Sequence, residues 1–200
     1  MTKYLKWTPN NPEKTQLAAF MQEHHNALLE EGYQSFWQWS VDNIEEFWDS
    51  FWDWAAIKGE KGPVTLANPD KMTGAQFYIY GDVNYAENLL QKRDGDTAII
   101  FRNELGVERT LTYNELYNEV SRWQQLLVRE GIGIGDRVAA YMPNIPETII
   151  AHLATASLGA IWSSASPDFG VQGVLDRFGQ IEPKILIAAD AYYYSGKKID

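Results

Sequence analysis

The stretch RVAAYMPNIPETIIAHLATASLGAIWSSA, residues 137–165, decides the fold. Its pattern predicts a buried strand, then a helix with Asn144 as its cap and Pro146 in its first turn, then a second buried strand. The helix is apolar on most sides, which is typical of a helix packed between a sheet and another layer. Two strands joined by a helix of this length predict parallel pairing with a right-handed crossover.

The same alternation continues downstream. Residues 171–181 carry apolar side chains at helical spacing, and KILIAAD at 184–190 predicts a third buried strand. Polar side chains follow the second strand, at the edge where open α/β sheets bind ligands. These side chains are Ser163, Ser164, Ser166 and Asp168. Two interpretations are open, a ligand-binding edge or a cap for the next helix.

The segment AYYYSGKKID, residues 191–200, follows the third strand and is expected to be a loop at the same edge. Its tyrosine rings and ammonium groups suit an adenine and a phosphate, although an exposed basic pair is commonly plain surface.

Upstream of the opening stretch, residues 97–112 predict a hairpin. A capping box of Thr112 and Glu115 then starts a helix that Gly131 ends. The glycines of GIGIGD, residues 131–136, follow a helix and lead into a strand. A phosphate-binding glycine loop has the opposite order, so this segment is interpreted as a helix stop and turn.

The chain changes character near residue 80, because the earlier part is helical and dense in aromatic residues. One helix is expected from about Thr15 to Glu31, and a second begins at a capping box of Asp42 and Glu45. The aromatic side chains are interpreted as core packing. Residues 58–75 predict a loop.

The histidines offer no metal site. His24 and His25 are adjacent on a helix and point in different directions, so they are not expected to share a metal ion. His152 is interpreted as a hydrogen-bonded structural residue. No metal-binding residue is therefore assigned.

Composition excludes several classes of function. The 200 residues carry a formal net charge of −10, which repels nucleic acid and anionic membranes, and neither is expected as a partner. The absence of cysteine removes disulfides and thiolate chemistry. No apolar run is long enough to cross a bilayer, so a cytoplasmic location is expected.

Four stretches carry a resemblance to a known family. They are NYAENLL at 84–90, LTYNEL at 111–116, the run 135–170, and VLDRFGQIEPKILI at 174–187. Together they resemble the N-terminal part of the acetoacetyl-CoA synthetase family, within the adenylate-forming acyl-CoA synthetase superfamily. The aromatic segment 33–54 is similar to the cap that precedes the adenylating domain there.

The resemblance implies an α/β fold with two parts. An aromatic-rich helical cap would occupy residues 1–80. The start of an AMP-binding domain, truncated, would occupy residues 81–200 and hold a partial layered sheet of parallel βαβ units.

The resemblance also implies an acid–thiol ligase. Acetoacetate attacks the α-phosphorus of Mg-ATP to give an acetoacetyl-adenylate, and the thiol of CoA then displaces AMP. ATP, Mg²⁺ and CoA are thus the implied cofactors of the full-length enzyme. The family's catalytic motifs match no residue here, so no catalytic residue is assigned. The 200 residues are expected to be inactive alone, to hold none of these cofactors, and to have the remainder of the same polypeptide as a partner.

One site carries over from related synthetases, which contact the CoA nucleotide through an arginine, glycine, arginine pattern. Gly196 matches the glycine, and Lys197 is a basic replacement for the second arginine. Tyr194 stands in place of the first arginine, and a tyrosine stacks on adenine but does not grip phosphate as a charged fork does. Two alternatives stay open, a ligase for another short acyl acid and a freestanding, non-catalytic α/β binding module.

Overall fold

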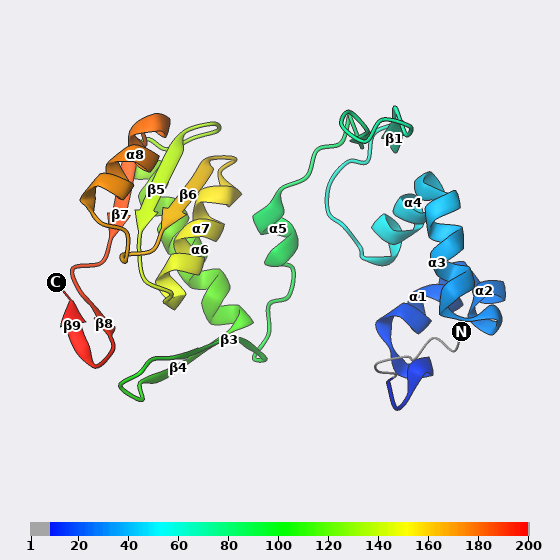
Figure 1. Cartoon of the computed structure of the whole chain (residues 1–200), viewed down its shortest axis with the longest axis horizontal. Coiled ribbons are helices and arrows are strands. Elements are labelled where there is room, and N and C mark those ends of the chain that lie inside the picture. Colours follow the sequence, from blue (N-terminus) through cyan, green and yellow to red (C-terminus); the bar gives the residue numbers. More distant parts are fainter. Residues whose placement is uncertain (1–8, 200) are drawn as a thin grey trace. The chain divides into compact units, whose positions relative to one another are not determined.

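The computed structural model describes residues 9–199, and contacts divide the chain into two compact units, the first ending at Val83 and the second starting at Asn84. The first unit consists of short helices followed by a small strand pair (Figure 1). Its elements are η1 Pro12–Lys14, α1 Gln16–His24, α2 Asn26–Glu31, α3 Tyr33–Asp42, α4 Ile44–Trp54, β1 Leu66–Ala67 and β2 Gln76–Phe77.

Aromatic rings form the core of the first unit, as the sequence predicts. Phe20 is 3% exposed, and four rings meet it edge-on with centroids 5.4 to 6.1 Å away. These rings belong to Phe36, Phe47, Phe51 and Trp54. Edge-on contact is the geometry that aromatic quadrupoles favour. Several aromatic side chains of this unit are exceptions that remain exposed, namely Tyr33, Trp37, Trp48, Phe77 and Tyr80.

Two predictions for the first unit are wrong. The helix expected over 15–31 is broken at His25, whose non-helical backbone lets its ring pack on Trp39 with centroids 3.7 Å apart. The capping box at Asp42 does not form, because α3 continues through Asp42 and an N-cap needs non-helical backbone. The Asp42 carboxylate instead accepts a hydrogen bond from Gln38, one turn earlier.

The second unit alternates strands and helices. Its elements are α5 Tyr85–Leu89, β3 Thr97–Arg102, β4 Glu108–Thr112, α6 Tyr113–Arg129, β5 Arg137–Tyr141, α7 Pro146–Ser157, β6 Ile161–Ala165, α8 Val171–Ile181, β7 Ile185–Ala188, β8 Tyr192–Tyr194 and β9 Lys197–Ile199. Strands β5, β6 and β7 form a parallel sheet in the order β6-β5-β7, and β3 pairs with β4 as the predicted antiparallel hairpin.

Helices cover both faces of the parallel sheet. On one face Val138, Trp162 and Ile185 pack with the buried side chains of α6 and α7. On the other face Ala139 packs with Phe178 of α8. Figure 1 shows α8 on one side of the sheet and the α6–α7 pair on the other. The chain is therefore an α/β protein with a partial layered sheet of parallel βαβ units.

Some of the helix caps and turns predicted around this sheet are present, and one is not. The capping box of Thr112 and Glu115 is present, and residues 131–136 form the predicted helix stop and turn, with Gly131 at φ +78°. Asn144 is not the cap of α7, because the helix begins one residue later, with Ile145 at the N-cap and Pro146 in the first turn. No helix among residues 9–199 combines the length and apolar character needed to span a bilayer.

One carboxylate joins the amino ends of β5 and β7. Asp136, just before β5, accepts hydrogen bonds from the Lys184 ammonium at 2.6 Å and the Gly133 N–H at 2.9 Å. The Lys184 contact, and then the Gly133 contact, hold the pKa of Asp136 below its ordinary value. Because Lys184 directly precedes β7, this carboxylate ties the starts of two adjacent strands.

Candidate functional site

The carboxyl ends of β5, β6 and β7 lie at one edge of the sheet because the three strands are parallel. Tyr141 ends β5, Ser166 directly follows β6, and Tyr192 lies four residues beyond the end of β7. In an open α/β sheet this edge is where ligands bind. The structure thus brings chain segments with polar side chains together at the position that the sequence predicts.

Asp168 is the centre of the polar contacts at this edge. Its carboxylate accepts hydrogen bonds from the Ser166 hydroxyl at 2.9 Å and from the Tyr192 hydroxyl at 3.1 Å. Partial burial, and then the bond to Asp168, raise the pKa of Tyr192 above its ordinary value. The Tyr141 hydroxyl is within 2.5 Å of the Pro167 carbonyl oxygen, to which it donates. These bonds give the segment after β6 a fixed shape.

The helix-cap interpretation of this segment is wrong, because the N-cap of α8 is Gly170. Neither Ser166 nor Asp168 reaches the first turn, since their side chains bond to each other. Ser163 and Ser164 lie within β6, where they pair with Ala139 and Ala140 of β5, and so they are strand residues.

Residues 192–199 form a hairpin, whereas the sequence predicts a loop. Strands β8 and β9 are antiparallel, and Ser195 and Gly196 turn the chain with φ values of +51° and +74°. Positive φ at both central residues is what a two-residue hairpin turn of this hand requires. The turn presents Lys197, exposed at the start of β9, next to Gly196.

The hairpin is anchored at both ends. Tyr192 at its base bonds to Asp168, and the Gly196 N–H at its tip donates to the Glu104 carboxylate at 3.0 Å. Glu104 lies in the turn between β3 and β4, 92 residues earlier in the chain. An anion that uses the Gly196 N–H must therefore compete with this carboxylate.

Between residues 9 and 199, no three His, Asp or Glu side chains gather closely enough to hold a metal. His152 stacks between the Tyr85 ring at 5.8 Å and the Trp162 ring at 5.6 Å. Ring packing is thus the contact that holds His152, in place of the hydrogen bond expected for it.

Sequence reasoning missed two residues of this edge, Tyr141 and Glu104. Tyr141 carries a signal that it could have used, because it lies at the carboxyl end of a predicted strand. Glu104 carries none, since nothing in a hairpin turn indicates a partner 92 residues away.

Comparison with known proteins agrees with this architecture. The family model described as "AMP-binding enzyme" matches residues 86–199. The acetoacetyl-coenzyme A synthetase of Rhizobium meliloti (strain 1021) is 54% identical over 168 residues, which are 84% of this chain and 26% of that protein. The 3-hydroxypropionyl-coenzyme A synthetase of Metallosphaera sedula is 38% identical over 141 residues, 68% of this chain and 21% of that protein.

A solved structure shows the same fold. The acetoacetyl-CoA synthetase from Streptomyces lividans superposes with a TM-score of 0.85 at 36% sequence identity, covering 94% of this chain and 30% of that one. The chain thus spans less than a third of the length of these relatives. With the family model matching more than half of its residues, the chain belongs to the AMP-binding enzyme family.

Proposed function

We propose that this chain is the N-terminal part of an ATP-dependent acid–thiol ligase that converts acetoacetate and CoA to acetoacetyl-CoA. The single observation that carries the proposal is the 54% identity, over 84% of the chain, to a protein named for that product. The parallel sheet supports it, because its carboxyl edge is where this class of fold receives a nucleotide.

The proposed reaction has two steps. The acetoacetate carboxylate attacks the α-phosphorus of ATP, so that an acyl-adenylate forms and pyrophosphate leaves. The CoA thiol then attacks the acyl carbonyl, and AMP leaves. Mg²⁺ would enter as the ATP complex. A cytoplasmic location stays a prediction.

The hairpin tip is the proposed CoA contact within this chain. The Lys197 ammonium would attract a phosphate of the CoA nucleotide, and the Gly196 N–H would donate to it once Glu104 withdraws. Tyr194, 60% exposed on β8, offers a ring face for the adenine. The tip would therefore serve the second step and leave adenylate formation untouched.

The reaction is tested by ATP–pyrophosphate exchange. We expect the full-length ligase to exchange labelled pyrophosphate into ATP in the presence of acetoacetate, and the 200-residue chain to show no exchange. Exchange by the 200-residue chain would disprove the proposal that adenylate formation needs the rest of the ligase. Faster exchange with 3-hydroxypropionate than with acetoacetate would favour the alternative that the 38% identical relative suggests, a ligase for another short acyl acid.

The CoA contact is tested by Lys197→Ala in the full-length ligase. Loss of one charge-assisted contact should raise the KM for CoA roughly tenfold and leave the exchange rate unchanged. Lys198→Ala is the matched control, because neighbouring strand residues point to opposite faces. An unchanged KM for CoA in Lys197→Ala would remove Lys197 from the site. Binding of CoA without any exchange by the longer protein would favour a non-catalytic binding module.

A further inference from the structure

A cavity of about 260 Å³ lies in the second unit, and none of its lining residues belongs to the sheet edge or the hairpin. Helix α5 with the segment after it, helix α6 and the end of α7 form its walls. Leu90 and Val120, which are 5% and 3% exposed, give it an apolar lining. Polar and charged side chains line the rest.

Hydrogen bonds fix the walls of this cavity. The Asn84 side chain accepts from the Glu87 N–H at 3.0 Å and donates to the Ala156 carbonyl oxygen at 3.1 Å, which holds α5 against α7. The Gln124 amide donates to the Ser157 hydroxyl at 2.8 Å, which joins α6 to α7. The cavity is therefore formed before any ligand arrives.

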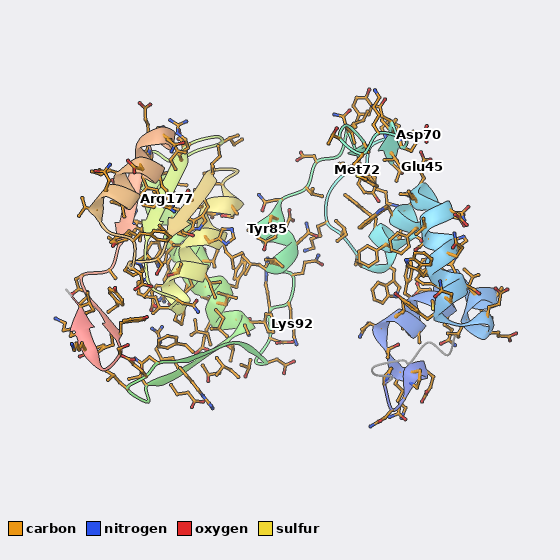
Figure 2. All side chains as sticks on the ribbon, in the orientation of Figure 1. Glu45, Asp70, Met72, Tyr85, Lys92 and Arg177 are labelled. Atoms are coloured by element: carbon orange, nitrogen blue, oxygen red, sulfur yellow. The ribbon has the colours of Figure 1, made fainter. Side chains whose placement is uncertain are left out.

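Arg93 brings a positive charge to the cavity. Its guanidinium carbon lies 3.8 Å from the centroid of the Tyr117 ring, and its Nε donates to the Leu90 carbonyl oxygen at 3.3 Å. Across residues 9–199, no carboxylate lies within 4.0 Å of the guanidinium. Its two terminal NH₂ groups are therefore available to bind a ligand carboxylate through two parallel hydrogen bonds. The adjacent Lys92, labelled beyond α5 in Figure 2, is instead paired with Asp96.

Glu87 brings a negative charge to the same cavity. Its carboxylate also has no ion-pair partner within the described part of the chain, so two opposite charges line one cavity without pairing. A ligand with only a carboxylate is repelled by Glu87, and one with only an ammonium is repelled by Arg93. A ligand that carries both charges can pair its carboxylate with Arg93 and its ammonium with Glu87.

The size of the cavity further limits which ligands can bind. Cavities that hold drug-sized ligands measure roughly 300 to 1,000 Å³, so a volume of about 260 Å³ is too small for a nucleotide. The apolar lining suits a short aliphatic group.

We propose that this cavity binds a small aliphatic α-amino acid as its zwitterion. The ligand carboxylate would lie on the Arg93 fork, its ammonium on Glu87, and its side chain against Leu90 and Val120. The proposal does not depend on the ligase activity, because every residue it uses lies outside the sheet edge and the hairpin.

The test is calorimetric titration of the 200-residue chain near neutral pH with three probes of similar shape. They are L-valine, isovalerate, which lacks the ammonium, and isobutylamine, which lacks the carboxylate. We expect L-valine to bind at least about tenfold more tightly than either analogue, because each analogue makes only one of the two charge-assisted contacts with Arg93 and Glu87. Isovalerate binding as tightly as L-valine, or an absence of L-valine binding, would overturn the proposal.

Two variants locate the binding site. Arg93→Gln and Glu87→Gln should each weaken L-valine binding by about tenfold or more, and Glu87→Gln should at the same time strengthen isovalerate binding. Arg122→Gln is the matched control, because Arg122 lies on α6, pairs with Glu119 and does not line the cavity. Circular dichroism checks that each variant is folded. Unchanged L-valine affinity in a folded Glu87→Gln variant would contradict the assignment, whatever the behaviour of Arg93→Gln.

Discussion

Single carboxylates define much of the second unit. Asp168 fixes the segment after β6, Glu104 occupies the amide at the hairpin tip, and Asp136 joins the starts of two strands. Glu115 closes its capping box by accepting from the Thr112 N–H, and then from the Thr112 hydroxyl, which lowers the pKa of Glu115. The pKa values of Asp136 and Glu115 are lowered by the hydrogen bonds that they accept, so these two carboxylates are points where acid weakens the fold.

The Asp136 contact predicts how stability depends on pH. Its pKa is lowered in the folded chain, so the stabilisation is complete above the ordinary aspartate value of about 4 and is lost as the pH falls through the folded value. Asp136→Asn should therefore be less stable than the parent at pH 7, and the difference should shrink toward about pH 3.

Urea unfolding at a series of pH values measures this difference. Asp176→Asn is the control, because Asp176 lies on the surface of α8 and accepts from the Gln172 side chain. An Asp136→Asn curve that stays parallel to that of the parent at every pH would contradict the prediction.

At the scale of elements, turns decide where the helices and strands end. Gly159, two residues after the end of α7, has φ +65°, and a Cβ placed there would lie 3.2 Å from the Ile134 Cγ1 atom. Because Ile134 is 90% exposed and can move aside, the main cost of a side chain is the left-handed backbone.

We expect Gly159→Ala to lower the free energy of unfolding by about 1 kcal/mol, the cost of a left-handed L-residue. Gly133→Ala is a matched control, because it has no left-handed φ and the nearest atom to its Cβ is 4.0 Å away. That variant should be unchanged or more stable by up to about 1 kcal/mol. Urea unfolding of both variants checks the prediction, and equal losses would show that backbone strain is not the cause.

Sequence predicted the elements whose signals are local. The capping box needs two residues three apart, and the hairpin of β3 and β4 follows from alternation on both sides of a turn. The cap at Asp42 failed because the preceding helix extends through it, which its own neighbours do not reveal. The hairpin of β8 and β9 was missed because three tyrosines in succession lack the alternation that marks a strand.

The candidate site could be predicted only in position. Parallel strands place Ser166 and Asp168 at a ligand-binding edge, and this follows from the strand order along the chain. The bonds from Tyr192 to Asp168 and from Gly196 to Glu104 join segments 24 and 92 residues apart. Contacts of that range depend on how the layers pack, which one sequence does not encode in any local pattern.

At the scale of the whole molecule, the chain is two compact units that each have their own core. The aromatic cluster around Phe20 lies entirely within the first, and the clusters on both faces of the parallel sheet lie within the second. A unit that holds its own core can fold by itself.

Residues 84–200 expressed alone should therefore unfold in a single cooperative transition. Helical circular dichroism and dispersed amide signals in NMR spectra would show the fold, and thermal unfolding would show its cooperativity. A polypeptide with collapsed, poorly dispersed spectra would contradict the independence of the second unit. The complementary piece, residues 1–83, serves as the comparison.

The central strand β5 limits which amino-acid substitutions this protein can accept. Val138, Ala139 and Ala140 have no exposed surface, and strands flank them on both sides. One added methylene at either alanine would have to displace a neighbouring layer. Over evolution, substitutions should therefore accumulate at the exposed borders of the sheet, whereas the codons of Val138, Ala139 and Ala140 should almost never change to those of larger residues.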